Sequence, residues 1–351
     1  MAEFEFKLPL GVELTRQQRR AIDSKEPIFL TGLPGTGKTV VSIYRLKESK
    51  NSILFTYGKL LKVAIENTIN DKSKIVVNIH RWHFDLNKSH LSNSLSHINI
   101  DKTIALFQQS CRYEQIIIDE GQDIEPNAYK LLSQITPRLS ISADNAQKVY
   151  ENGADEETIL DILPHLKKIA LYKNFRNSYK IYNFGKEFVP DNPRAINSNL
   201  LNRFDDIENE DSAIPEVYIL DSLDTTVETI RKILDNFKNK TIGILSENIV
   251  TVETYHKRLK KNYQISSYTS RDKKVPTSLF NIVITTFKSS KGMEFDIVIM
   301  PQFQHAMSSN RVEFYIGATR ARERLYILAI NELPEILEQI DKSTYKLIKR
   351  L

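Results

Sequence analysis

Short runs of β-branched and other apolar residues alternate with longer amphipathic stretches along the chain. In the first part, apolar runs predict strands at residues 28–31, 53–56, 74–79, 115–118 and 139–143. Between them, apolar residues recur at spacings of three and four over residues 37–47 and 59–69, which indicates helices. Short buried strands alternating with helices predict a parallel sheet covered by helices on both faces.

The same alternation begins again in the second part of the chain. It predicts strands at residues 168–170, 216–220, 241–245, 282–286, 297–300 and 324–328, and helices at residues 225–237, 250–261 and 311–321. We therefore expect two tandem α/β domains, residues 1–160 and residues 161–351. Residues 188–214 are rich in Asn, Asp and Pro without a clear pattern, so we expect a loop there.

The composition is that of an ordinary globular protein, with 41% hydrophobic and 26% charged residues. The 49 basic and 44 acidic residues leave a net charge of +5, which is compatible with a polyanionic partner but does not require one. Cys111 is the only cysteine, which excludes an internal disulfide and fits a reducing cytoplasm. We expect no secretory signal and no membrane span, because no apolar run approaches about 18 residues.

A glycine-rich turn follows the first predicted strand and precedes the first predicted helix. Its sequence, Gly32-Leu-Pro-Gly-Thr-Gly-Lys-Thr39, fits the phosphate-loop pattern G-x-x-x-x-G-K-[ST]. Gly35 and Gly37 let backbone N–H groups point at phosphate oxygens, and the helix N-terminus adds positive potential. Lys38 is expected to reach the outer phosphates of ATP, and the Thr39 hydroxyl to ligate Mg²⁺. A chance glycine turn is the alternative, which the flanking strand and helix disfavour.

Two carboxylates follow the predicted strand at residues 115–118. They open the sequence Asp119-Glu-Gly-Gln-Asp123, at the strand end where ligands bind in open α/β sheets. Asp119 is expected to hold Mg²⁺, and Glu120 to orient and deprotonate the attacking water, so the pair implies hydrolysis. Taken alone, the segment has a solvated acidic turn as its alternative.

The order of the remaining motifs resembles that of superfamily 1 helicases of the UvrD/Rep type, over about residues 14–328. Asp119–Asp123 resembles the D-E-x-Q-D box of this family, and residues 315–322 resemble its Y-x-A-x-T-R-A motif. Further similar segments are residues 14–22, 142–150, 174–177 and 285–296. The resemblance implies two RecA-like domains, with ATP hydrolysed in the cleft between them.

The resemblance also implies nucleotide contacts outside the phosphate loop. Gln18 would read the adenine edge and Gln147 would sense the γ-phosphate. Gly292 and Glu294 would lie near the nucleotide, with Glu294 against the ribose. A lone glutamine on a helix is usually just solvated, which is the alternative for Gln18.

Two arginines would act as arginine fingers, again by resemblance. Arg176 lies in Asn174-Phe-Arg-Asn177 and Arg320 in Tyr315-Ile-Gly-Ala-Thr-Arg-Ala-Arg322. Negative charge shifts on the phosphate oxygens in the transition state, and a guanidinium group that arrives on closure stabilises it.

A single nucleic-acid strand is expected to lie across both domains, held by small polar groups and by aromatic rings that stack on bases. The resemblance assigns these contacts to Thr56, Tyr57, His80, Trp82, Thr286, Lys288 and Ser289. A core position is the alternative for Trp82, the only tryptophan. Residues 147–154 depart from the family motif, because they are one residue shorter and keep only Tyr150 of its aromatic pair.

The motif spacings leave no room for the large inserted domains of bigger relatives. Thirty-six residues separate Trp82 from Asp119, and 108 separate Arg176 from Thr285. Our interpretation is a compact ATP-dependent translocase or helicase on single-stranded nucleic acid, with DNA and the 3′-to-5′ direction favoured by resemblance. A protein partner such as a nuclease is expected. The alternatives are a nucleotide-gated protein-interaction module with slow hydrolysis and no unwinding, and a nucleotide kinase, which the carboxylate box disfavours.

Overall fold

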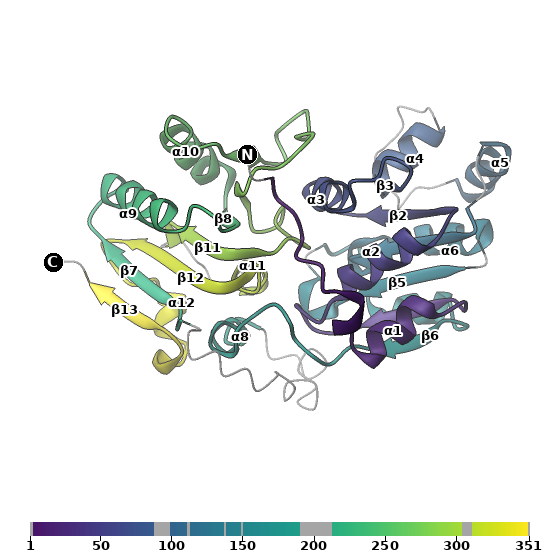
Figure 1. The fold of residues 1–351 in the computed structure, drawn as a ribbon, viewed down its shortest axis with the longest axis horizontal. Coiled ribbons are helices and arrows are strands. Elements are labelled where there is room, and N and C mark those ends of the chain that lie inside the picture. Colours follow the sequence, from purple (N-terminus) through teal and green to yellow (C-terminus); the bar gives the residue numbers. More distant parts are fainter. Residues whose placement is uncertain are drawn as a thin grey trace. The chain divides into compact units, whose positions relative to one another are not determined.

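The computed structural model describes residues 3–87, 99–110, 113–136, 138–148, 150–189, 213–303 and 311–349. These residues form two units (Figure 1). The first unit spans Lys7–Asn174, and the second takes residues 3–6 and the described residues from Phe175 onward. None of the described helices is both long and apolar enough to cross a membrane.

The first unit contains one parallel sheet of six described strands in the order β3-β2-β4-β5-β1-β6. The strands are β1 (Ile28–Thr31), β2 (Ser52–Thr56), β3 (Ile75–Asn78), β4 (Gln115–Asp119), β5 (Leu139–Ala143) and β6 (Lys167–Ala170). The first five confirm predicted strands. Sequence analysis assigned β6 to the second domain, whereas it pairs with β1 and buries Ile169 with Ile28 and Leu30. The chain therefore leaves the first unit after Asn174, beyond the domain boundary predicted between residues 160 and 161.

Helices cover both faces of this sheet, as the continuous apolar strands predict. Ile28 and Leu30 face one side and pack with α1 (Arg16–Asp23) and α2 (Lys38–Glu48). Phe29 faces the other side, in a core shared by α4 (Ile79–Asn87), α5 (Ile100–Ser110), α6 (Pro126–Ile135) and α7 (Glu156–Ile162). The helix α3 (Lys59–Ile69) contacts α2, β2 and β3.

The second unit contains a parallel sheet of seven described strands in the order β13-β7-β12-β11-β8-β10-β9. The strands are β7 (Glu216–Leu220), β8 (Ile242–Ser246), β9 (Ser266–Tyr268), β10 (Ile282–Thr286), β11 (Phe295–Pro301), β12 (Ala321–Ile330) and β13 (Lys346–Lys349). Sequence analysis missed β9, which is three residues long, and β13, whose side chains are mostly exposed. Residues 190–212, most of the predicted loop, lie outside the described residues.

This second sheet is also covered on both faces. The helices α9 (Leu223–Asn236) and α10 (Ile249–Leu259) pack on Ile242, Ile244 and Ile297. On the other side, α8 (Tyr179–Lys186) contacts α11 (Arg311–Ala318), whose Phe314 ring lies 5.6 Å from the ring of Phe287. The predicted fold class, two α/β domains with parallel sheets covered by helices on both faces, is thus confirmed.

Residues at the start of the described chain belong to the second unit. The Phe4 N–H donates to the Leu279 carbonyl at 2.7 Å, and the Phe4 ring lies 5.5 Å from the Phe295 ring. Phe4 is fully buried, and Glu3 forms an antiparallel bridge with Phe280. The described chain therefore runs from the second unit through the first and back to the second.

Candidate nucleotide-binding and nucleic-acid-binding sites

The predicted phosphate loop connects β1 to α2 at the C-terminal edge of the first sheet. Gly35 and Gly37 have φ angles of 80° and 86°, a left-handed conformation that glycine adopts without steric strain. Gly37 is the N-cap residue of α2, so the unpaired N–H groups of the first helical turn point into the loop. This geometry is suited to an anion such as a phosphate chain.

Gln18 lies directly behind this loop and is 3% exposed. Its side-chain Nε2 donates to the Thr36 carbonyl at 3.1 Å, and its Oε1 accepts from the Thr15 N–H at 2.9 Å. A Cβ atom on Gly37 would lie 2.4 Å from that Nε2. Gln18 therefore braces the phosphate loop in this structure, and its predicted contact with adenine remains a prediction.

The Lys38 ammonium group is held by acceptors of its own unit. Its Nζ donates to the carbonyl oxygens of Gly32 at 2.5 Å and Leu33 at 3.1 Å, and to Asp144 Oδ2 at 3.4 Å. The residue is buried, with 8% of its surface exposed. Phosphate oxygens that approach the loop would exchange with these acceptors for the same cation.

Thr39 and Asp119 meet at one point, although 80 residues separate them in the sequence. The Thr39 hydroxyl donates to Asp119 Oδ2 at 2.7 Å, and the Ser142 hydroxyl donates to Oδ1 at 2.5 Å. Burial and the neighbouring Glu120 raise the pKa of Asp119 to about 6, although hydrogen bonds from Ser142 and Thr39 partly offset this. A buried carboxylate with a raised pKa favours the approach of a cation.

This oxygen pair fits Mg²⁺, the ion that the sequence predicts. A hydroxyl and a carboxylate are hard oxygen ligands, and Mg²⁺ usually takes only one or two such groups beside substrate phosphates. Within the described part of the chain, no cluster of three or more His, Cys, Asp or Glu residues could hold a metal by itself. Thr39 and Asp119 would therefore hold the ion together with the phosphates of a bound nucleotide.

Glu120 follows Asp119 and belongs to a continuous hydrogen-bonded network. Gln122 Nε2 donates to Glu120 Oε2 at 2.6 Å, and Gln122 Oε1 accepts from the Asp144 N–H at 2.9 Å. Asp144 Oδ2 in turn accepts from Gln147 Nε2 at 2.7 Å and from Lys38. The structure thus connects the three predicted catalytic groups of the first unit, Lys38, Glu120 and Gln147.

Sequence analysis did not assign a role to Gln122 or Asp144. Gln122 is fully buried and Asp144 is 6% exposed, so both are internal links of the network. A signal was present, because Asp144 follows β5 directly and therefore reaches the same sheet edge as Asp119. Pairing of the two side chains with Glu120 and Lys38 could not be predicted from spacing alone.

The backbone at Glu120 is strained. Its φ of 57° and ψ of 43° place a non-glycine residue in the left-handed region. The following turn is packed so closely that a Cβ atom on Gly153 would lie 2.2 Å from the Gln122 carbonyl oxygen. Strain that close packing maintains is common where a side chain must be aimed at a reacting group.

Three aromatic rings gather near the ends of the first unit's strands. The ring of Tyr57 lies 5.0 Å from that of His80 and 4.6 Å from that of Tyr150. All three residues are partly exposed, as stacking on bases requires. Thr56, in contrast, is fully buried, and its hydroxyl donates to the Gly58 carbonyl at 3.2 Å.

Trp82 lies in the hydrophobic core of the first unit and is 9% exposed. Its ring packs at 4.9 Å from Phe55 and 6.0 Å from Phe107. The structure therefore gives this ring a packing role, which is the alternative that the sequence left open. Its predicted contact with nucleic acid has no support in this arrangement, because the ring faces α5 and the sheet.

In the second unit, Arg176 and Glu294 form an ion pair. Arg176 Nε donates to Glu294 Oε2 at 2.9 Å, and Arg322 Nη1 donates to Oε1 of the same carboxylate at 2.9 Å. The predicted arginine finger and the predicted ribose ligand are thus brought together. Sequence analysis missed Arg322, since it could not show which arginine of residues 320–322 reaches Glu294.

Arg320 is fully buried. Its guanidinium group donates to the carbonyl oxygens of Ile316 at 2.9 Å and Met293 at 3.2 Å, and to the Thr319 hydroxyl at 3.2 Å. These contacts fix the start of β12 against the turn at Gly292, which has a φ of 78°. The predicted phosphate contact of Arg320 remains a prediction.

The remaining predicted nucleic-acid contacts lie in the turn after β10. The Thr286 hydroxyl donates to Ser289 Oγ at 3.1 Å and accepts from the Ser289 N–H at 3.2 Å, which closes the turn. Lys288 is about half exposed and pairs with Glu313 at 3.0 Å. The structure thus places Thr286, Lys288 and Ser289 together at one strand end.

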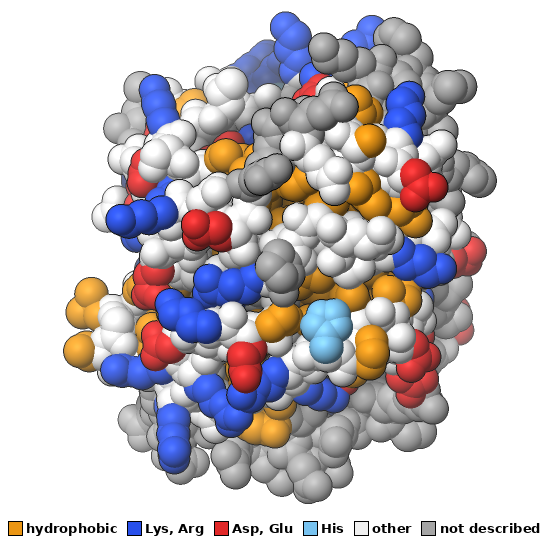
Figure 2. Space-filling model, turned by 90° about the vertical axis from the view of Figure 1, so that its right-hand side faces the viewer, with side chains coloured by type: hydrophobic (Ala, Val, Ile, Leu, Met, Phe, Trp, Pro, Cys, Tyr) orange, Lys and Arg blue, Asp and Glu red, His pale blue; other side chains and the backbone are white. Residues whose placement is uncertain are grey.

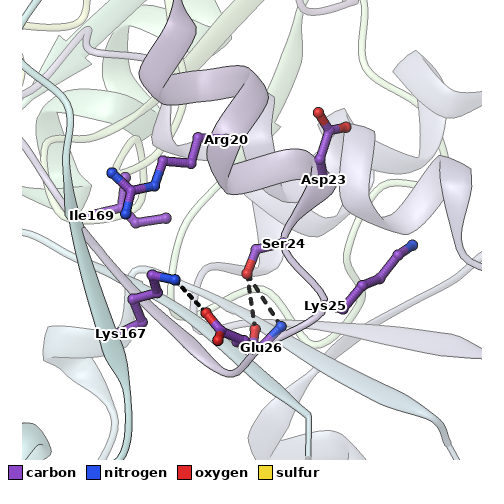
Figure 3. A pocket seen from close by; sticks show the side chains of 7 residues that line it. All are labelled: Arg20, Asp23, Ser24, Lys25, Glu26, Lys167 and Ile169. Carbon is purple, nitrogen blue, oxygen red and sulfur yellow. Dashed lines mark hydrogen bonds and ion pairs between the residues drawn. The ribbon is translucent and has the colours of Figure 1, made fainter.

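A pocket of about 270 Å³ lies at the opposite edge of the first sheet, beside the N-terminal ends of β1 and β6 (Figure 3). Its lining residues are Arg20, Asp23, Ser24, Lys25, Glu26, Lys167 and Ile169. Lys167 pairs with Glu26 at 2.5 Å. None of the predicted site residues lines it, so it is separate from the nucleotide site.

On the face shown in Figure 2, Lys and Arg side chains are mixed with Asp and Glu side chains.

Fold and site together define a phosphate-loop NTPase. Comparison with known families shows that residues 18–152 match the AAA domain and residues 281–328 match the UvrD-like helicase C-terminal domain. The second match confirms the resemblance to superfamily 1 helicases of the UvrD/Rep type.

Individual relatives are more distant. A stretch of 116 residues is 30% identical to YjcD of Bacillus subtilis (strain 168), named as a candidate ATP-dependent DNA helicase, and covers 31% of this chain and 15% of that protein. The chain thus spans a small part of that relative. Among solved structures, a Pif1 helicase has 13% identity and a TM-score of 0.49 over 94% of each chain. The PRRSV helicase has 14% identity and a TM-score of 0.46, over 89% of this chain and 54% of that one.

Proposed function

We propose that the protein hydrolyses ATP and uses it to move along single-stranded nucleic acid as a translocase or helicase. DNA and the 3′-to-5′ direction are favoured through the resemblance to UvrD/Rep-like helicases. The observation that carries the proposal is the meeting of Thr39 and Asp119 at 2.7 Å, beside Lys38 and Glu120, which Asp144 and Gln122 join in one polar network. Such a group of residues serves metal-assisted phosphoryl transfer to water.

The residues of the first unit divide this work. Lys38 would exchange its carbonyl acceptors for phosphate oxygens. Thr39 and Asp119 would provide oxygen ligands for Mg²⁺, which would neutralise charge on the phosphates. Glu120 accepts a proton from the attacking water, while Gln122 holds its carboxylate in place at 2.6 Å. Asp144 orients the Gln147 side chain by accepting a hydrogen bond from its Nε2, and Gln147 would contact the γ-phosphate.

The second unit would supply the remaining charge. Arg176 and Arg320 are proposed to stabilise the negative charge that develops on the phosphate oxygens. Gly292 and Glu294 are proposed to lie near the sugar, as in the family. Since Arg176 pairs with Glu294 in this structure, its proposed contact with phosphate requires exchange of that ion pair.

The proposed nucleic-acid contacts are those that combine exposure with stacking or hydrogen-bonding groups. Tyr57, His80 and Tyr150 offer rings for bases, and Ser289 offers a small polar group for the nucleic-acid backbone, whereas Thr286 is only 9% exposed and holds the turn that carries Ser289. Base stacking on such rings contributes about 1–3 kcal/mol per base. A protein partner such as a nuclease belongs to the same proposal, because the large inserted domains of bigger relatives have no counterpart in the motif spacings.

A nucleotide-gated protein-interaction module is the second candidate, favoured by the shortened segment after Gln147. Measurement of ATP turnover with and without single-stranded DNA or RNA separates the two. A rise of about tenfold or more supports the translocase. An unchanged, slow rate with both polymers contradicts it and supports the module. Strand displacement on DNA and RNA duplexes then identifies the preferred polymer.

A further inference from the structure

The Glu294 carboxylate is shared by two guanidinium groups inside the second unit. Each of its oxygens accepts from a different arginine at 2.9 Å, Oε2 from Arg176 and Oε1 from Arg322. The Glu294 side chain is 15% exposed, that of Arg176 is 11% exposed and that of Arg322 is 23% exposed. Burial would raise the pKa of Glu294, but Arg176 and Arg322 outweigh it and lower the pKa below its ordinary value.

The backbone around this group is fixed on every side. Asn177 Nδ2 donates to the carbonyl oxygens of Thr319 and Ala321, at 3.1 Å and 2.5 Å. The Ser178 N–H donates to the Arg322 carbonyl at 3.3 Å, and the Phe295 N–H donates to the Arg320 carbonyl at 2.9 Å. Any exchange of partners within the group therefore has to come from side-chain rotation rather than from movement of the strands.

We propose that Arg322 is a positioning residue that keeps Glu294 paired when Arg176 leaves it for a phosphate oxygen. This inference rests on the proposed ATPase function. With Arg322 in place, the departure of Arg176 leaves a carboxylate that still has one cationic partner. Without Arg322, the same departure leaves an isolated buried carboxylate, which is strongly unfavourable. Arg322 thus lowers the barrier to release of Arg176 and does not itself touch the nucleotide.

The first test compares the ATP turnover of Arg322→Gln, Arg322→Lys and the wild type. Arg322→Gln should lower kcat about tenfold, with a smaller change in KM, because ground-state binding of ATP does not need the exchange. Arg322→Lys keeps a positive charge and should recover part of the loss. Arg324→Gln is the matched control, since Arg324 lies on the same strand and stacks on Phe237 at 5.5 Å instead.

The pH profile distinguishes positioning from a merely structural role. In Arg322→Gln, Glu294 left alone would have a raised pKa and could take up a proton at low pH, which removes the unpaired charge. The ratio of wild-type to variant kcat should therefore shrink as the pH falls from about 8 to about 6. A structural defect gives a ratio independent of pH, and that result would overturn the proposal.

A double substitution completes the test. In a Glu294→Gln background, Arg322→Gln should lower kcat by less than twofold, since no carboxylate is left to pair. Full additivity of the two losses contradicts the proposal. If the wild type hydrolyses no ATP, the proposed function fails instead, and thermal unfolding of the same variants still shows whether residues 294 and 322 are coupled. Additive changes in Tm would then overturn the contact itself.

Discussion

Asp119 in the first unit is buried and Glu294 in the second is largely buried, yet the pKa values of these two carboxylates move in opposite directions. Burial and Glu120 raise the pKa of Asp119 to about 6, and the hydroxyl groups that face it only partly compensate. Burial also acts on Glu294, but two guanidinium groups at 2.9 Å reverse its effect and lower the pKa. The neighbours of Asp119 do not fully offset the cost of its buried charge, whereas the two arginines beside Glu294 more than offset it.

The difference shows how each unit is prepared for chemistry. The first unit has assembled its oxygen ligands, and a cation that joins Thr39 and Asp119 would gain a favourable partner. In the second unit Arg176 is already paired with Glu294, so the proposed contact of its guanidinium group with a phosphate starts with an exchange of that pair.

The largest effect is expected from Glu120→Gln, which tests the proposed catalytic site of the first unit. The amide cannot accept the proton of the attacking water, so ATP turnover should fall about 10²- to 10⁴-fold. Binding of a fluorescent ATP analogue should persist, because Lys38, Thr39 and Asp119 are unchanged. Glu66→Gln on α3 is the control and should retain full turnover. A Glu120→Gln variant with normal turnover would show that another group activates the water.

Gly153→Ala should disturb the polar network of the first unit by displacing the backbone at Gln122. The added methyl group would lie 2.2 Å from the Gln122 carbonyl oxygen, and backbone atoms cannot easily move away. We expect a loss of about 1–3 kcal/mol in the free energy of unfolding, measured with urea, and a fall in ATP turnover as Gln122 shifts. A Cβ atom on Gly11 meets nothing within 4 Å, so Gly11→Ala should leave stability within about 0.5 kcal/mol of the wild type. Equal stability of the two variants would show that the turn can relax.

The smallest expected effect tests the opposite pKa shifts directly, by thermal unfolding of the nucleotide-free protein. The raised pKa of Asp119 means that stability falls as the pH rises from 3.8 through about 6. Asp119→Asn should therefore raise Tm at pH values near 8, by about 2–4 °C for each kcal/mol regained, with a weaker effect near pH 5. The lowered pKa of Glu294 stabilises the fold above its ordinary value of 4.5 and loses this effect as the pH falls. Glu294→Gln should accordingly lower Tm near pH 8, and two shifts of the same sign would refute the comparison.

Much of the fold followed from the sequence because the determinants are local. The strands that carry the site, β1, β4, β5 and β10, are short runs of buried apolar residues and lie where the pattern predicts them. The neighbourhood of Thr39 and Asp119 was also predictable, because both follow buried parallel strands at one sheet edge.

The remainder depends on contacts that spacing does not encode. Strand β6 belongs to the first sheet because it pairs with β1. The apolar pattern of the predicted strand at residues 168–170 does not indicate which sheet it joins. Trp82 occurs in a motif context that suggests stacking, yet Phe55 and Phe107 enclose its ring. The link between Gln122 and Asp144, and the choice of Arg322 as the partner of Glu294, depend on side-chain directions that only the folded chain defines.

The burial of Phe4 against Phe295 has a consequence for biosynthesis. Residues 7–174 contain every strand of the first sheet among the described residues, so this part can fold on the ribosome as it emerges. Phe4 must wait for a partner that is translated about 290 residues later. During that interval an aromatic residue upstream of a finished domain stays exposed to water and to chaperones. The contact between Phe4 and Phe295 therefore forms only after the whole first unit has been synthesised.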